Sequence, residues 1–167
     1  RISFMNEMTI LCEYYGADIE DIRKGIGTDT RIGPAFLRAG CGYGGSCFPK
    51  DVAAMEHISR LAGHENLFVD AIQTINKNQK KRFVDKIESK LGRPIQGTTI
   101  AVWGLAFKAD TDDIRESASI DVIQYLLEKG ATVRAHDYKG MENMKQIFKD
   151  KVEWATDPVT AAAGADA

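Results

Sequence analysis

The change from helical to strand-like hydrophobic spacing near residue 92 most constrains the fold of this chain. Residues 98–103 form a β-branched and apolar run bounded by glycines, and residues 132–136 form a second such run. Residues 120–129, between them, have helical spacing and end at Gly130. A helix that joins two strands makes them a parallel pair, because parallel neighbours need a crossover connection. The pattern predicts an α/β fold with a parallel sheet in this half of the chain.

The alternation continues to the end of the sequence. Residues 141–148 have helical spacing, residues 152–154 favour a short strand, and Asp157 is a typical N-cap for a last helix that Gly164 should end. The chain starts inside a helical pattern without an initiator methionine. We therefore expect it to be a piece of a longer protein.

Helical spacing dominates residues 1–91. Apolar residues recur at helical intervals from the first residues onward, and Asp18 is a suitable N-cap for a short second helix. A glycine-rich stretch, residues 33–45, has neither helical nor strand periodicity and is predicted to be a loop. A helix follows Pro49, and Asn66 should cap a long helix that ends near Leu91.

Charge and cysteine content exclude several classes of partner. Lys and Arg number 22 against 24 Asp and Glu, so no basic field would attract nucleic acid or an anionic membrane. The apolar runs are far shorter than the roughly 20 residues of a membrane span. The cysteine count is 3, an odd number that argues against a disulfide framework and for a reducing compartment. We expect a cytoplasmic protein.

The most unusual cluster of residues surrounds Cys47, where the glycine-rich loop enters a helix. The helix dipole and the neighbouring Lys50 should both favour the thiolate, which makes Cys47 a candidate nucleophile. Asp51 follows at i+4, a spacing that would place thiol and carboxylate one turn apart on one face. A structural cysteine beside a charged helix start is the alternative interpretation.

The other cysteines and the histidines have simpler explanations. Cys12 lies on an apolar helix face and is expected in the core, and Cys41 can be a packed loop thiol. Cys41 and Cys47 with His57 and His64 match no common zinc spacing, so no metal is expected. No histidine is placed beside Cys47 by the sequence, which argues against a cysteine-dependent hydrolase.

A second candidate site follows the first strand of the expected sheet. Lys108 and Arg115 lie on the stretch after Trp103, outside the carboxyl end of a parallel strand, where anionic ligands usually bind. Gly104 is the single glycine where a dinucleotide fold uses three, so NAD is not expected at this turn. A solvated charged loop is the alternative.

Two motifs together, residues 42–51 and residues 103–117, resemble those of the nucleotide-sugar dehydrogenases of the UDP-glucose/GDP-mannose dehydrogenase family. Asn6-Glu7, Asp29-x-Arg31-Ile-Gly33 and Asp70 with Asn76 also occur in the family's order, so the resemblance covers nearly all of the chain. It implies a mostly helical central domain over residues 1–91 and a Rossmann-like, UDP-binding domain over residues 92–167. It also implies a homodimer formed through the central domain, and an NAD-binding domain that lies outside this chain.

The resemblance further implies a two-step oxidation of UDP-glucose to UDP-glucuronate with NAD as the oxidant. Cys47 would capture the aldehyde intermediate as a thiohemiacetal that is oxidised to a thioester, and Asp51 would position or activate the hydrolytic water. Arg31 would reach the sugar site of the neighbouring subunit, and Arg115 would meet the NAD phosphates. The remaining positions that match substrate contacts of the family are Phe36, Leu37, Arg38, Tyr43, Gly44, Phe48, Lys50, Phe107 and Lys108.

Other functions stay open at this point. Relatives in the same family act on GDP-mannose or on UDP-N-acetylhexosamines with the same chemistry. A non-catalytic nucleotide-sugar-binding and dimerisation module is a further alternative, since the visible segment alone would lack the cofactor domain.

Overall fold

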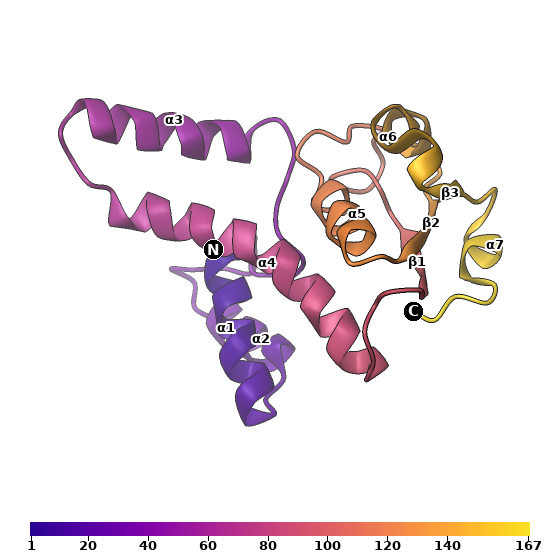
Figure 1. The fold of residues 1–167 in the computed structure, drawn as a ribbon. Helices are drawn as coiled ribbons and strands as arrows, with labels where there is room; N and C mark the ends of the chain where they lie inside the picture. The colour runs from indigo at the N-terminus through magenta and orange to yellow at the C-terminus, as the bar shows by residue number, and fades with distance from the viewer. The chain divides into compact units, whose positions relative to one another are not determined.

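The computed structural model describes residues 1–167 and follows the expected order of a helical part and then an α/β part (Figure 1). The elements are α1 (Ile2–Tyr15), α2 (Ile19–Gly27), α3 (Phe48–Leu61), α4 (Leu67–Leu91), β1 (Thr99–Trp103), α5 (Ala118–Glu128), β2 (Thr132–His136), α6 (Met141–Phe148), the 3-10 turn η1 (Lys149–Lys151), β3 (Glu153–Trp154) and α7 (Pro158–Ala162). None of these helices combines the length and the apolar character needed to cross a bilayer.

Side-chain caps define several helix starts at the positions that the sequence indicates. Asp18 accepts a hydrogen bond from the backbone N–H of Glu20 at the start of α2, at 2.9 Å. Asn66 accepts one from Val69 at the start of α4, and Asp157 accepts one from Thr160 at the start of α7. These bonds satisfy N–H groups that have no partner within the helix, which is why these residue types favour helix starts.

The strands form a three-stranded parallel sheet in the order β1-β2-β3, which confirms the predicted α/β architecture. Ile100 pairs with Val133 and Trp103 with His136, so β1 and β2 end at the same edge. On the other side of β1, Asp166 donates its N–H to the carbonyl of Thr99 and Ala101 donates to the carbonyl of Ala167, both at 2.8 Å. Helices α5 and α7 lie on opposite faces of the sheet (Figure 1).

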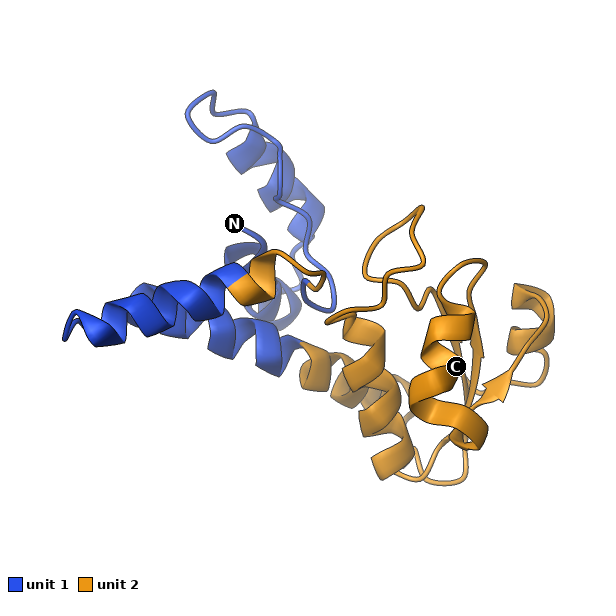
Figure 2. Ribbon diagram, turned by 90° about the horizontal axis from the view of Figure 1, so that it is seen from above, with its two compact units in different colours: residues 1–43, 51–79 blue, residues 44–50, 80–167 orange.

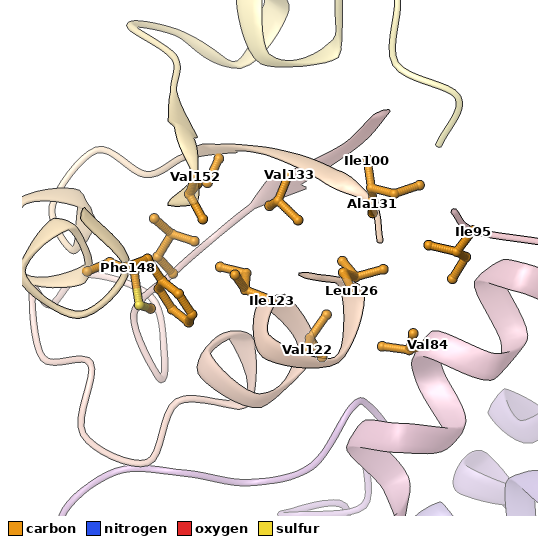
Figure 3. Packing of buried hydrophobic residues seen from close by; sticks show 13 residues of the cluster. Val84, Ile95, Ile100, Val122, Ile123, Leu126, Ala131, Val133, Phe148 and Val152 are labelled. Carbon is orange, nitrogen blue, oxygen red and sulfur yellow. The ribbon is translucent and has the colours of Figure 1, made fainter. Parts of the chain in front are cut away.

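The main hydrophobic core lies between the sheet and the helices that cover one face of it (Figure 3). Ile123 and Leu126 of α5 and Val133 of β2 are fully buried, and Phe148 of α6 closes one end. Val84 of α4 joins the same cluster, so the second half of α4 packs with the α/β part. Burial of this apolar surface is the main force that holds the sheet and its helices together.

The chain divides into two compact units that interrupt each other in sequence (Figure 2). Unit 1 contains residues 1–43 and 51–79, and unit 2 contains residues 44–50 and 80–167. Helix α4 contributes to both units, with the division between Gln79 and Lys80. The domain boundary expected near residue 91 stays a prediction, since packing units and domains need not coincide.

Helix α3 differs from a typical amphipathic helix of a globular core. Its apolar residues Met55, Ile58 and Leu61 are exposed, and Ser59 is its buried residue. Helical spacing of apolar residues therefore predicts this helix correctly but does not make these side chains part of a core of the chain.

Candidate functional site

Cys47 lies directly before α3, on a turn of residues 44–47 that we call the Cys47 turn. Its thiol is free and exposed, and Sγ is 3.8 Å from Oγ of Ser46. The first turn of α3 contains Phe48, Lys50 and the acidic residue Asp51. Cys47 is therefore the residue immediately before the first turn of α3.

The Cys47 turn packs closely against the loop of residues 107–117, which we call the β1–α5 loop. The N–H of Gly45 donates to the carbonyl of Arg115 at 2.9 Å. A Cβ on Gly44 would lie 1.9 Å from the carbonyl oxygen of Glu116, and a Cβ on Gly45 would lie 2.7 Å from the ring of Phe107. Glycine is required here by the close approach of another segment, because any side chain would overlap it.

Asp113 and Arg115 form a two-pronged ion pair within this loop. Oδ2 of Asp113 is 2.6 Å from Nη2 of Arg115, and Oδ1 is 2.9 Å from both Nε and the backbone N of Arg115. The hydrogen bonds from Arg115 hold the pKa of Asp113 at about 2, and Asp113 in turn raises the pKa of Arg115. Cys47 adds a smaller electrostatic effect that raises the Arg115 pKa further, so the thiol lies within electrostatic reach of this guanidinium.

Lys108 and Phe107 lie at the start of the same loop, beyond the carboxyl end of β1. Nζ of Lys108 is 5.4 Å from the centroid of the Phe107 ring, a cation–π geometry. Lys108 also lines an open pocket of about 440 Å³ at the carboxyl ends of β1 and β2, together with Trp103, His136 and Tyr138. Ligands of open α/β sheets bind at this edge.

The turn that follows β1 is occupied by a carboxylate of the protein. Oδ2 of Asp137 accepts the N–H of Leu105 at 2.7 Å, and its Oδ1 accepts the N–H groups of Lys139 and Gly140. Burial raises the pKa of Asp137, but these backbone hydrogen bonds outweigh it and lower the pKa overall. The N–H of Leu105 is one that would face a dinucleotide phosphate in a glycine-rich turn, so this turn does not fit a pyrophosphate.

The predicted site residues of unit 1 lie on the loops that precede the Cys47 turn. Arg31 is held by Asp29, with Nη2 2.6 Å from Oδ2, and its side chain is 87% exposed. Arg31 lowers the pKa of Asp29 through these hydrogen bonds. Phe36 is exposed with φ of 61°, and Arg38 is exposed.

Leu37 and Tyr43 are less accessible than their neighbours. Leu37 is 1% exposed, so its side chain and its backbone are almost wholly covered by the protein. Tyr43 is half-buried, and burial raises the pKa of its hydroxyl.

Amide side chains that we did not single out as site residues hold the glycine-rich loop. Asn76 accepts the N–H of Tyr43 at 2.8 Å and donates to its carbonyl at 3.1 Å. Asn6 accepts the N–H of Gly40, and Gln79 donates to the carbonyl of Gly40, both at 2.8 Å. A long glycine-rich loop offers few side chains of its own for such bonds, so amides on neighbouring helices are a signal that could have identified these residues.

Cys12 and Cys41 form no disulfide, and Cys12 is buried as predicted while Cys41 is partly buried. No group of three or more His, Cys, Asp and Glu side chains is arranged to hold a metal ion.

Comparisons with known proteins connect both segments to one family. A sequence profile described as the UDP-glucose/GDP-mannose dehydrogenase family, central domain, matches residues 1–78. A second profile, the UDP binding domain of the same family, matches residues 101–167. The two profiles together cover the loops that carry Cys47 and Arg115.

Individual relatives agree with the profiles. UDP-glucose 6-dehydrogenase of Rickettsia bellii is 46% identical over 90% of this chain and 35% of its own length. The structure of a UDP-glucose dehydrogenase from Pyrobaculum islandicum matches with a TM-score of 0.93 and 36% identity, over 98% of this chain and 38% of its own. A GDP-mannose dehydrogenase structure from Pseudomonas aeruginosa matches with a TM-score of 0.69 and 26% identity, over 98% of this chain and 39% of its own.

The chain thus spans little more than a third of the length of these relatives. Within that span, both the central-domain profile and the UDP-binding profile are matched in the family's order. This chain belongs to the UDP-glucose/GDP-mannose dehydrogenase family.

Proposed function

We propose that this chain is the part of an NAD-dependent UDP-glucose dehydrogenase that supplies the nucleophile and much of the nucleotide-sugar site. The observation that carries the proposal is the exposed Cys47 thiol, placed at a helix start on a turn that the β1–α5 loop holds in place. A purely structural cysteine would gain little from exposure. The family to which the chain belongs supports the same interpretation.

Cys47 would make the second oxidation possible by forming a covalent intermediate with the aldehyde. Loss of a hydride and a proton from the C6 alcohol of the sugar yields an aldehyde. The Cys47 thiolate then adds to the aldehyde carbon, and the oxygen takes up a proton to give a thiohemiacetal. Loss of a second hydride and the hydroxyl proton gives a thioester, and water then breaks the carbon–sulfur bond to release the carboxylate and the thiolate.

Neighbouring residues would assist the sulfur chemistry. Asp51, in the first turn of α3, would position or activate the water that hydrolyses the thioester. Lys50 and Phe48 would line the sugar, together with Tyr43 and Gly44. Phe107 and Lys108 would contact the substrate from the β1–α5 loop, and Phe36, Leu37 and Arg38 would contact the nucleotide.

NAD, when bound, would supply the acceptor for both hydrides. The Arg115 side chain is 68% exposed while Asp113 fixes its orientation, so its outer N–H groups suit one phosphate contact. The turn after β1 does not suit the pyrophosphate, because Asp137 already accepts the N–H groups of Leu105 and Ala106 there. We therefore place the dinucleotide turn outside this chain and assign Arg115 to the edge of the cofactor.

UDP-glucose is the proposed substrate because the structural match to a UDP-glucose dehydrogenase is better than the match to a GDP-mannose dehydrogenase. The UDP-glucose dehydrogenase from Pyrobaculum islandicum matches with a TM-score of 0.93, against 0.69 for the GDP-mannose dehydrogenase. Both share the cysteine-dependent chemistry in this proposal, so the substrate needs a direct test.

The test is the number of NADH molecules formed per UDP-glucose by the protein expressed from its complete reading frame, with GDP-mannose assayed in parallel. Two NADH per UDP-glucose is the expected result. Cys47→Ser should abolish uronate formation while UDP-glucose binding is nearly retained, and Cys41→Ser in the same loop is the matched control. Turnover of GDP-mannose alone would replace the substrate, and no turnover of either would favour a binding module.

We also propose a homodimer in which Arg31 serves the neighbouring subunit's site. Its side chain is 87% exposed and held by Asp29, so it is available to a second chain. Mixed dimers of Arg31→Ala and Cys47→Ser chains should regain activity, because one of the two shared sites is then intact. No recovery on mixing would contradict a shared site.

A further inference from the structure

The β1–α5 loop, which packs against the Cys47 turn, contains two residues with an unusual backbone conformation. Asp110 and Glu116 have φ values of 63° and 53°, in the left-handed region that favours glycine. Such conformations cost free energy and persist only where the surrounding structure holds them. The Glu116 carbonyl is also the group that lies against Gly44 of the Cys47 turn.

Asp113 connects the parts of this loop. Its carboxylate binds the Arg115 guanidinium and backbone N–H, with distances from 2.6 to 3.1 Å. Its carbonyl accepts the N–H of Phe107 at 3.0 Å, and its own N–H donates to Oγ1 of Thr111 at 3.1 Å. The Asp113 side chain is 20% exposed, against 68% for Arg115, so the carboxylate is the more fixed partner.

The same loop makes the contacts that hold the nucleophile. The Arg115 carbonyl accepts the Gly45 N–H, and the Phe107 ring lies where a Gly45 side chain would be. Asp113 therefore binds, through its side chain or backbone, both residues that contact Gly45.

We propose that Asp113 is a positioning residue for Cys47, which fixes the β1–α5 loop so that Arg115 and Phe107 hold the Cys47 turn in one orientation. This inference rests on the proposed function, in which Cys47 captures the aldehyde. Misplacement of a nucleophile by about 1 Å can cost on the order of a hundredfold in rate. The first oxidation does not use Cys47, so loosening the turn should slow capture and leave aldehyde formation much less affected.

The experiment compares Asp113→Asn with Asp112→Asn in the protein expressed from its complete reading frame. Asparagine keeps the size of the side chain but loses the charge that binds Arg115 from two sides. UDP-glucose is supplied with saturating NAD and with hydroxylamine, which traps free aldehyde. Asp113→Asn should lower the NADH formed per UDP-glucose from two towards one and lower the rate of uronate formation at least about tenfold.

A merely structural role would not give this pattern. Partial unfolding lowers the amount of active enzyme but leaves the ratio at two, as Asp112→Asn should. If Asp113→Asn does not fold, Thr111→Val removes the acceptor of the Asp113 N–H and should shift the ratio in the same direction by less. If both Asp113→Asn and Asp112→Asn form two NADH per UDP-glucose in the presence of hydroxylamine, the inference is overturned. Uronate formation by Cys47→Ser would instead overturn the proposed function.

Discussion

Gly44 and Glu116 approach each other so closely that a Cβ on Gly44 would lie 1.9 Å from the Glu116 carbonyl oxygen. The obstacle is backbone, which cannot rotate away as a side-chain end could. This approach brings the Cys47 turn and the β1–α5 loop together as one surface of unit 2.

Gly44→Ala should therefore displace the Cys47 turn. We expect kcat to fall by roughly a hundredfold, and the free energy of unfolding to fall by about 1–3 kcal/mol, as for an overpacked core. Gly40→Ala is the matched control, because a Cβ there would meet nothing within 4 Å. Steady-state kinetics and urea unfolding measure both effects, and more than half of the normal kcat in Gly44→Ala would contradict the prediction.

The Asp113–Arg115 pair predicts a defined dependence of stability on pH. The folded pKa of Asp113 is about 2, below its ordinary value of 3.8, because of the hydrogen bonds from Arg115. Its contribution to stability is thus complete above the ordinary value and is lost as the pH falls through about 2. The difference in unfolding free energy between the unaltered protein and Asp113→Asn should be constant down to about pH 4 and shrink below it. Urea unfolding at several pH values tests this, and a difference already lost near about pH 5 would contradict the assignment.

Asn76 should control the order of the glycine-rich loop. Its side chain makes both hydrogen bonds to Tyr43, so Asn76→Ala leaves the Tyr43 N–H and carbonyl without these partners. We expect amide exchange of residues 40–43 to rise about tenfold, as lost hydrogen bonds of about 1–2 kcal/mol imply. Hydrogen–deuterium exchange measures it. Asn78→Ala, on an exposed position of the same helix, should leave the exchange unchanged.

Substitution of Asp121 should lower the free energy of unfolding more than substitution of Lys80. Lys80 is 8% exposed and its ammonium group is paired with Asp121, whose side chain is 43% exposed. Asp121→Asn leaves the buried Lys80 charge without its partner and should lower the free energy of unfolding by about 1–3 kcal/mol. This loss is smaller than for a fully buried pair, because solvent reaches Asp121. Lys80→Met removes the charge and keeps the volume, so it should cost less. Urea unfolding of both variants decides the order, and an equal loss would contradict it.

Most secondary structure was predictable from local signals. Asp18, Asn66 and Asp157 mark helix starts because their side chains satisfy free N–H groups there, whatever packs nearby. Gly92 and Gly130 end α4 and α5 with φ of 65° and 82°, conformations that glycine adopts without strain. The turn η1 was not predicted. It begins at Lys149, which has φ of 50°, and the sequence signals such a backbone conformation only where a glycine stands.

For the candidate site, local sequence features suggest candidate residues but not the contacts that hold them. Cys47 is recognisable from a thiol at a helix start, which is a local feature. Its contacts with Phe107, Arg115 and Glu116 come from a distant part of the sequence, and the glycines that permit them resemble those of a flexible loop. Exposed Met55 and Ile58 show the same limit, since spacing predicts a helix but not what covers it.

The interrupted order of the two units affects any attempt to exchange parts between relatives. Residues 44–50 pack with residues 80–167, although residues of unit 1 surround them in the chain. A chimera joined at a single point in α4 would combine the Cys47 turn of one parent with the β1–α5 loop of the other. An exchange intended to alter nucleotide preference therefore has to carry residues 44–50 along with the C-terminal part, so that Gly44 and Gly45 still meet the loop to which they are fitted.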